Sequence, residues 1–268
     1  MKLESSSSLL VTVATTLLTA VVINGKTLIT KPDFITQCRT DDLEFNRCLG
    51  RNFQAFFTEW QEGLLSPKYV GDLDPLFVKR ISIEQDLRHP VSMNANLHNL
   101  EVKGLKETRV ENVSFDLNDL LAKVTLVVPK LNIHSDYTIT GRILSLALNG
   151  NGKAFIRAEH VEIKLLIRFK LRDEDGLTFM DIDKLHAEIK EVGGFGIRLD
   201  NLFHGQKVLE ESAHVVFNEN WHEFYEILRP AIKSAIENIV TERLSKIFAN
   251  LPATFIIGEL PTAAEFYG

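Results

Sequence analysis

VEIKLLIRFKL, residues 161–171, alternates between apolar and mostly charged side chains along its whole length. Successive side chains of an extended strand point to opposite faces, so this stretch would present one dry face and one wet face. The dry face would carry Val161, Ile163, Leu165, Ile167, Phe169 and Leu171. The wet face would carry Glu162, Lys164, Arg168 and Lys170. The stretch therefore predicts a β-strand of unusual length.

Other parts of the chain repeat this period of two, but with interruptions. The alternation runs through residues 91–97, slips by one at His98, and resumes at Leu100. A similar slip separates residues 137–143 from residues 144–148. A slip of this kind is typical of a β-bulge, and bulges bend sheets. We therefore expect long, strongly curved antiparallel strands.

Turn residues divide this central region, which reads as strand after strand from about residue 78 to 216. The candidates for tight reversals are Asn-Gly-Asn-Gly at 149–152 and Asp-Glu-Asp-Gly at 173–176. Asn, Asp and Gly accept the positive φ that hairpin turns require.

Helical spacing appears only on the two sides of this central region. From residue 41 to about 64, apolar residues recur every three or four positions at Leu49, Phe53, Phe56, Phe57, Trp60 and Leu64. A second stripe runs from Asn220 to Asn250, where Asn220 and Glu223 could form a capping box. Pro230 would either bend this second helix or mark the start of a shorter one. Its apolar stripe needs a concave apolar surface, and the curved sheet is the candidate.

The beginning of the chain indicates export. An uncharged run, LLVTVATTLLTAVVI at residues 9–23, follows Lys2 and ends before Asn24 and Gly25. The run is shorter than a comfortable membrane span of about 20 residues but suits the core of a secretory signal, so residues 1–25 are predicted to be a signal peptide. A retained membrane anchor is the alternative. The rest, residues 26–268, would be a single domain that is secreted and extracellular.

An oxidising compartment makes a disulfide the default state of two neighbouring cysteines, and the chain has only Cys38 and Cys48. We expect a structural bridge that fixes the entry of the first helix. Asn112, in Asn-Val-Ser, is the sole glycosylation sequon.

Composition and motifs exclude several classes of function. The formal net charge is -6, and without a basic run the chain has no electrostatic footprint for nucleic acid or anionic lipid. We find no nucleophile elbow, zincin motif, phosphate loop or dinucleotide fingerprint, and the eight histidines lack metal-ligand spacing. The glycines at 193, 194 and 196 fit a bend or a close backbone approach in a strand better than a phosphate cradle. We therefore expect no catalytic residues, no cofactor and no metal.

Several sequence segments, in their order along the chain, resemble those of the insect takeout and haemolymph juvenile-hormone-binding family. They are the cysteine pair ahead of the first helix, GDLDPLFVKRISIEQ at 71–85, NGNGK at 149–153 and NENWHEFYEILRPAIKSAIENIV at 218–240. The absence of a cysteine after Cys48 makes the takeout branch the closer match. The resemblance implies an α+β fold of the tubular lipid-binding kind: a long C-terminal helix wrapped by a highly curved antiparallel sheet, with an N-terminal helix and an elongated apolar tunnel.

Alternation alone does not distinguish side chains that line a tunnel from side chains that fill a core. We select candidate ligand-binding residues by the face on which they fall. They are Leu49, Phe53 and Trp60 on the first helix, Val161, Ile163 and Leu165 on the clearest strand, and Trp221, Phe224 and Leu228 on the last helix. Tyr137 and His160, near strand ends with apolar neighbours, are the candidates for anchoring a ligand oxygen.

The function favoured by these patterns is that of a secreted, monomeric carrier that solubilises a slender hydrophobic molecule. A terpenoid hormone, a fatty acid or a similar lipid would suit such a wall equally well. An extracellular interaction protein, whose ligand switches its affinity for an unidentified receptor, is an alternative. A lipid-ester hydrolase is another. No stable membrane insertion is expected once the signal peptide is removed.

Overall fold

The computed structural model describes residues 30–62, 70–85, 91–143 and 146–268 of the chain. The predicted signal peptide at residues 1–25 lies outside these ranges. Within them no helix is both long and apolar enough to cross a membrane.

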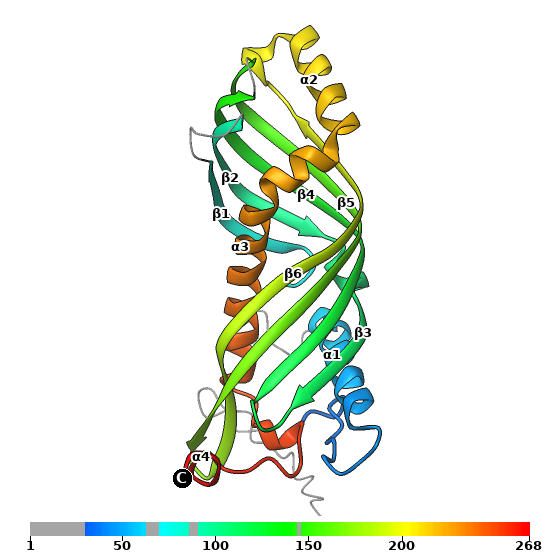
Figure 1. Cartoon of the computed structure of the whole chain (residues 1–268), viewed down its shortest axis with the longest axis vertical. Coiled ribbons are helices and arrows are strands. Elements are labelled where there is room, and N and C mark those ends of the chain that lie inside the picture. Colours follow the sequence, from blue (N-terminus) through cyan, green and yellow to red (C-terminus); the bar gives the residue numbers. More distant parts are fainter. Residues whose placement is uncertain (1–29, 63–69, 86–90, 144–145) are drawn as a thin grey trace, which may run out of the picture.

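A single sheet forms the body of the molecule, and all its recorded pairings are antiparallel. Its order is β1-β2-β4-β5-β6, and β3 pairs with β4 outside this path. The strands are β1 (Leu76–Gln85), β2 (Val91–Lys103), β3 (Arg109–Asp116), β4 (Leu121–Ile143), β5 (Leu146–Glu174) and β6 (Leu177–Leu199). The sheet wraps around the long axis of the molecule (Figure 1).

The strand predicted at 161–171 is the second half of β5, which is 29 residues long. All six residues of its predicted dry face are buried, and Ile167 has no exposed surface at all. Wet-face residues from this strand form ion pairs across to β6, such as Lys170 with Asp183 at 2.6 Å. The predicted two-faced strand is confirmed.

Bulges interrupt the sheet where the alternation slips. The β2–β4 register shifts between His98 and Glu101, and Asn99 lies there with a φ of 53°. The β5–β6 register shifts at two further places, after Glu162 and after Arg168. Each extra residue increases the local twist and bends the strand, which is how so long a sheet closes on itself. The predicted curvature is confirmed.

The turn predicted at residues 149–152 is wrong. These residues lie inside β5, where Gly150 pairs with Ile139 and Gly152 pairs with Tyr137. The chain instead reverses between Ile143 and Leu146, at the site we had interpreted as a slip. The glycines serve close packing: a Cβ on Gly152 would lie 2.2 Å from the carbonyl oxygen of Asp200.

The turn predicted at residues 173–176 is confirmed. It joins β5 to β6, with positive φ angles at Asp175 (52°) and Gly176 (76°). Two successive positive φ values are what a tight two-residue hairpin requires.

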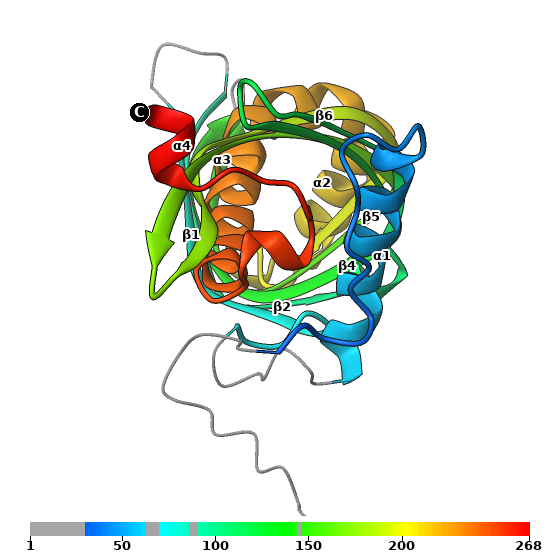
Figure 2. The same cartoon turned by 90° about the horizontal axis from the view of Figure 1, so that it is seen from below.

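Four α-helices and three short 3-10 turns complete the described chain. The helices are α1 (Phe45–Glu62), α2 (Lys207–Glu219), α3 (Trp221–Phe248) and α4 (Ala263–Tyr267). The 3-10 turns are η1 (Leu105–Glu107), η2 (Phe203–Gly205) and η3 (Ala253–Phe255). Viewed along the long axis, α1 and α3 lie on different sides of the ring of strands (Figure 2).

Helix α1 agrees with the prediction from residues 41–64, but α2 was missed because we extended the strand region to residue 216. This segment contains the β-branched residues Val208, Val215 and Val216, which have strand propensity. These valines are exposed, whereas Glu210, Ala213 and Phe217, spaced at three and four, are buried. Helical burial of this narrow stripe outweighs the strand propensity of the valines.

The junction between α2 and α3 also differs from the prediction. Asn220 does not cap α3, because its side-chain amide donates to the carbonyl oxygen of Val216 at 2.9 Å and so completes the end of α2. Pro230 lies inside α3, which is 28 residues long and changes direction along its length (Figure 1). Of the two alternatives for Pro230, a bent helix is therefore correct.

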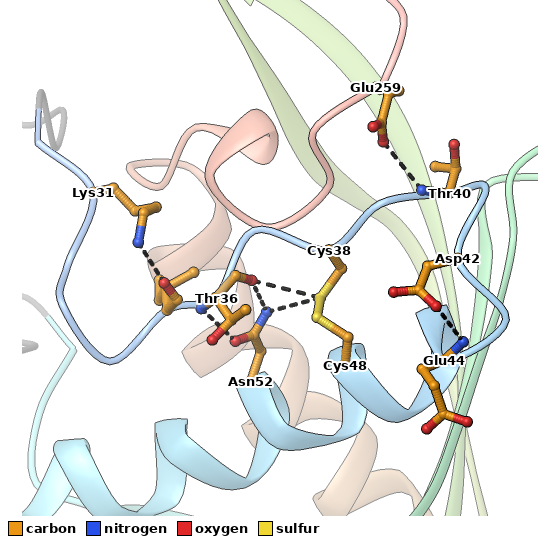
Figure 3. Close-up of a disulfide and its surroundings, with 10 residues drawn as sticks. Lys31, Thr36, Cys38, Thr40, Asp42, Glu44, Cys48, Asn52 and Glu259 are labelled. Atoms are coloured by element: carbon orange, nitrogen blue, oxygen red, sulfur yellow. Dashed lines mark hydrogen bonds between the residues drawn. A yellow bond between two sulfur atoms is a disulfide. The ribbon is translucent and has the colours of Figure 1, made fainter.

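The disulfide joins Cys38 to Cys48 on α1, as expected, and it also lies at a junction with the C-terminal segment (Figure 3). The Cys38 amide donates to the Ile256 carbonyl oxygen at 2.7 Å, and the Gly258 amide donates to the Cys38 carbonyl oxygen at 3.0 Å. Asn52 on α1 accepts a bond from the Thr36 amide at 2.9 Å and donates to the Thr36 carbonyl oxygen at 2.6 Å. The disulfide therefore ties the segment before α1 to that helix, and backbone hydrogen bonds join the same segment to residues 256–258.

Replacing Cys38 and Cys48 together by serine should lower the free energy of unfolding by about 2 to 3 kcal/mol, the loop-entropy value for a separation of this length. Urea unfolding measures the change. A reductant should destabilise the unmodified protein to the same level and leave the double variant unchanged. Equal stability of the two proteins under oxidising conditions would contradict the prediction.

Gly152→Ala should destabilise the fold by about 1 to 3 kcal/mol, because the new methyl group overlaps the Asp200 carbonyl oxygen. Gly194→Ala is the matched control, since its methyl group would lie 3.5 Å from the flexible Glu159 side chain. Urea unfolding of both variants gives the comparison, and an equal loss in the two would refute the close-packing explanation.

Candidate functional site

The buried apolar residues of the described chain form two clusters at different levels of the sheet. The lower cluster joins α1, strands β3 to β6, α3 and the C-terminal segment, and it includes Val161, Ile163, Leu165, Tyr225 and Phe248. The upper cluster joins β2, β4, β5 and the end of β6 to α2, and it includes Tyr137, Ile139, Leu148, Leu199 and Phe217. In Figure 1, α1 and the C-terminal segment lie at one end of the sheet and α2 lies at the other.

The inner face of the sheet is partly exposed between these clusters. Ile133 on β4 lies four positions before the buried Tyr137, so the two side chains point to the same face of the sheet. Ile156 on β5 pairs directly with Ile133 and therefore lies on that face too. Both isoleucines keep some accessible surface, and neither belongs to either cluster. Apolar packing of the described residues is therefore not continuous along the inner face.

Helix α3 shows the same incomplete burial. It packs along β6 on the concave side of the sheet, yet only Tyr225, Ile247 and Phe248 are buried among its residues. The apolar side chains that keep accessible surface recur at helical spacing: Leu228, Ile232, Ile236, Val240 and Leu244. Ile232, Ile236, Val240 and Leu244 pack against the lower cluster, and each still keeps part of its apolar surface uncovered by the described protein.

The structure collects most of the predicted ligand-binding residues in the lower cluster. Leu49, Val161, Ile163 and Leu165 are buried there, and the side chains that pack against it with partial exposure include Phe53 and Trp221. Phe224 packs against the upper cluster instead. Leu228 lies on the partly exposed stripe of α3. Trp60 belongs to α1, but its side chain lies outside what the structure describes.

Tyr137, predicted to anchor a ligand oxygen, already has a partner for its hydroxyl group. The phenol is 3% exposed and donates to the carbonyl oxygen of Asp200 at 3.0 Å. Burial raises the pKa of Tyr137 to about 12, and the negative charges of Glu210 and Asp200 act in the same direction. Its hydroxyl therefore joins β4 to the segment after β6, which is a structural role.

His160, the other predicted anchor, points away from the interior. Its side chain is exposed and its φ is 46°, because the strand alternation slips at this residue. The residue opposite is Gly193, where an added Cβ would lie 3.0 Å from the His160 Cβ. The prediction for His160 is therefore wrong, whereas the explanation of Gly193 by close approach is confirmed.

The sequence analysis missed several buried polar groups that have no hydrogen-bond partner in the structure, among them the hydroxyl groups of Ser135 on β4 and Tyr225 on α3. Tyr225 on α3 is 8% exposed, and its hydroxyl group has no hydrogen-bond partner in the structure. It lies four positions after Trp221 on the same side of the helix, so helical spacing could have identified it.

Two further polar side chains of the sheet, Asn112 and Asp181, are at least partly exposed. Asn112 is exposed on β3, which leaves the sequon accessible. Asp181 pairs with Arg172 at 2.7 Å in a solvent-exposed setting. Within the described ranges no group of three or more His, Cys, Asp or Glu side chains could hold a metal ion.

Comparison with known proteins identifies the family. The model of the haemolymph juvenile hormone binding protein (JHBP) family matches residues 12–258. The chain belongs to the JHBP family. The resemblance to the takeout and juvenile-hormone-binding group seen in the sequence is thus confirmed.

Two proteins similar to this chain are circadian clock-controlled proteins named daywake. The one from Drosophila yakuba is 28% identical over 234 residues, which are 82% of this chain and 86% of the relative. The one from Drosophila melanogaster is 26% identical over 230 residues, with the same coverage of each chain. Takeout 1 from Epiphyas postvittana has a similar crystal structure, with a TM-score of 0.71 and 23% identity over 83% of this chain and 99% of its own. This likeness confirms the α+β fold with its long curved sheet.

Tyr137→Phe should lower the free energy of unfolding by about 1 kcal/mol, because the Asp200 carbonyl loses its donor in a buried setting. The pH dependence should also change. A folded-state pKa of about 12, above the usual value of roughly 10, means that stability from the neutral phenol is complete below pH 10 and is lost as the pH rises toward 12. Between pH 10 and pH 12, the free energy of unfolding should therefore fall less steeply in the variant than in the unmodified protein. Identical slopes would contradict the assignment.

Proposed function

We propose that this chain is a secreted carrier that binds a slender hydrophobic molecule between α3 and the concave face of the sheet. The proposal rests chiefly on the apolar stripe of α3, which stays partly accessible although the helix lies on the concave side of the sheet. Membership of the JHBP family supports it, because the family description names a hydrophobic hormone as the bound molecule.

The chemistry of the inner wall suits a ligand held by burial rather than by charge. Ile133, Ile156 and the α3 stripe offer aliphatic surface, and the ion pairs of β5 and β6 lie on the outer face. A ligand that buried about 400 Å² of apolar surface would gain roughly 10 kcal/mol before the cost of association is subtracted. Such a wall favours elongated apolar molecules and discriminates weakly among them, so polar groups must supply orientation.

Two observations support export to an extracellular location. The Cys38–Cys48 bridge is typical of oxidising compartments, and residues 9–23 have the length and composition of a signal core. The domain after residue 25 would then act as a single, monomeric unit.

Native mass spectrometry of the purified protein should detect a bound lipid, and N-phenyl-1-naphthylamine (NPN), a neutral hydrophobic fluorophore, should bind and be displaced by that lipid. Ile156→Trp should weaken NPN binding by roughly tenfold, or ~1.4 kcal/mol, because the larger ring occupies space beside the partly exposed inner face.

Phe155→Trp is the matched control for this experiment. Phe155 is the next residue of β5 and lies on the outer face, where its ring contacts His134 with 5.1 Å between ring centroids. It should leave NPN affinity unchanged. A protein that binds neither lipid nor NPN would overturn the carrier proposal, and equal effects of the two tryptophans would overturn the location.

A further inference from the structure

Tyr225 carries a buried hydroxyl group that the fold does not use. The side chain is 8% exposed, and the hydroxyl has no hydrogen-bond partner in the structure. An unpaired buried hydroxyl is unfavourable for the folded protein, whereas phenylalanine would fill the same space without that cost. Its presence on α3, at the edge of the proposed ligand site, calls for a partner that none of the described residues provides.

The surroundings of Tyr225 favour an organic ligand over a buried water molecule. Its ring lies 6.4 Å from the ring of Phe195 on β6 and 6.4 Å from the indole of Trp221, measured between centroids. A buried water molecule needs two to four polar partners. The recorded contacts of the Tyr225 ring are aromatic apart from Arg229, and a single oxygen on an otherwise apolar molecule needs only one donor.

The charges near Tyr225 select among possible ligand oxygens. The cation that the structure places against the ring is Arg229, whose guanidinium carbon lies 6.0 Å from the ring centroid. Arg229 already donates to the Glu226 carboxylate at 3.1 Å and to the Ile189 carbonyl oxygen at 2.8 Å. Arg229 is therefore already paired with Glu226, and their two charges act on the Tyr225 phenol in opposite directions. A carboxylate brought beside Tyr225 would lose its hydration without gaining a free positive charge.

The phenol itself remains a donor at physiological pH. Burial raises the pKa of Tyr225, although the charge of Arg229 opposes this effect. The hydroxyl group therefore stays protonated and can donate to a neutral oxygen acceptor.

We infer that Tyr225 is the residue that orients the ligand, by donating a hydrogen bond from its hydroxyl group to a neutral oxygen of a lipid such as an ester, ketone or epoxide. This inference rests on the proposed carrier function and narrows its ligand class. A free fatty acid, ionised at neutral pH, is disfavoured as the ligand. The apolar part of the ligand would extend along the partly exposed stripe of α3, away from Tyr225.

The test compares methyl dodecanoate, dodecanoate and dodecane as competitors of NPN at pH 8. The unmodified protein should bind the ester more tightly than the carboxylate. Tyr225→Phe should weaken ester binding by about 3- to 10-fold, the value of one neutral hydrogen bond, and should leave dodecane binding unchanged. The stability of the ligand-free variant should be equal or higher, because an unpaired hydroxyl group has been removed.

Tyr137→Phe provides the matched control. It makes the same substitution at a similarly buried tyrosine, but at one whose hydroxyl group already donates to Asp200. It should lower stability and leave the ester affinity unchanged, which is the reverse of the result for Tyr225→Phe.

Three results would overturn the inference but not the carrier function, provided that NPN and lipids still bind to the unmodified protein. The Tyr225→Phe variant could keep its full affinity for the ester, or it could bind all three competitors equally more weakly. The unmodified protein could also bind the carboxylate more tightly than the ester. Failure of Tyr225→Phe to fold would also overturn it, because the hydroxyl would then have a structural role. If the unmodified protein binds neither NPN nor any competitor, both the inference and the proposed function fail.

Discussion

The antiparallel pairing of β4 with β5 is the constraint on which the rest of the molecule depends. It runs from Leu121 opposite Arg168 to Ile143 opposite Leu146, and the alternation of both strands assigns each side chain to an inner or outer face. Flanking strands inherit these faces, and bulges bend the sheet toward the apolar one. A concave apolar face requires cover, and α3 and α1 provide it.

Much of the fold could be predicted from the sequence because period two and period 3.6 are properties of the chain itself. Residues 161–171 and α1 are examples. The errors arose where tertiary contacts determine the outcome. Gly150 and Gly152 read as a turn because their conformational freedom is visible in the sequence, but the close approach of Asp200 to Gly152 is not. The valines of α2 read as a strand because burial of the opposite stripe depends on packing against β6.

The candidate site was predictable in its apolar part and not in its polar part. The strand alternation alone predicted that Val161, Ile163 and Leu165 point to the interior, where they are buried. No pattern in the sequence distinguishes the buried Tyr137 from the buried Tyr225, because the difference lies in their hydrogen bonds. The Tyr137 hydroxyl donates to the Asp200 carbonyl oxygen, whereas the Tyr225 hydroxyl has no partner among the described residues. His160 failed as an anchor because a single residue with positive φ reversed its direction.

The contact between residues 38–40 and residues 256–259 has a consequence for biosynthesis. Thr40 donates its backbone amide to Glu259, 219 positions later, at 3.1 Å, and Cys38 pairs with Ile257 beside it. The sheet is complete once Leu199 has been made, and the disulfide once Cys48 has. Residues 256–259 must therefore be synthesised before the contacts with residues 38–40 can form. Folding at this end of the sheet therefore depends on contacts between residues that lie 219 positions apart in the sequence.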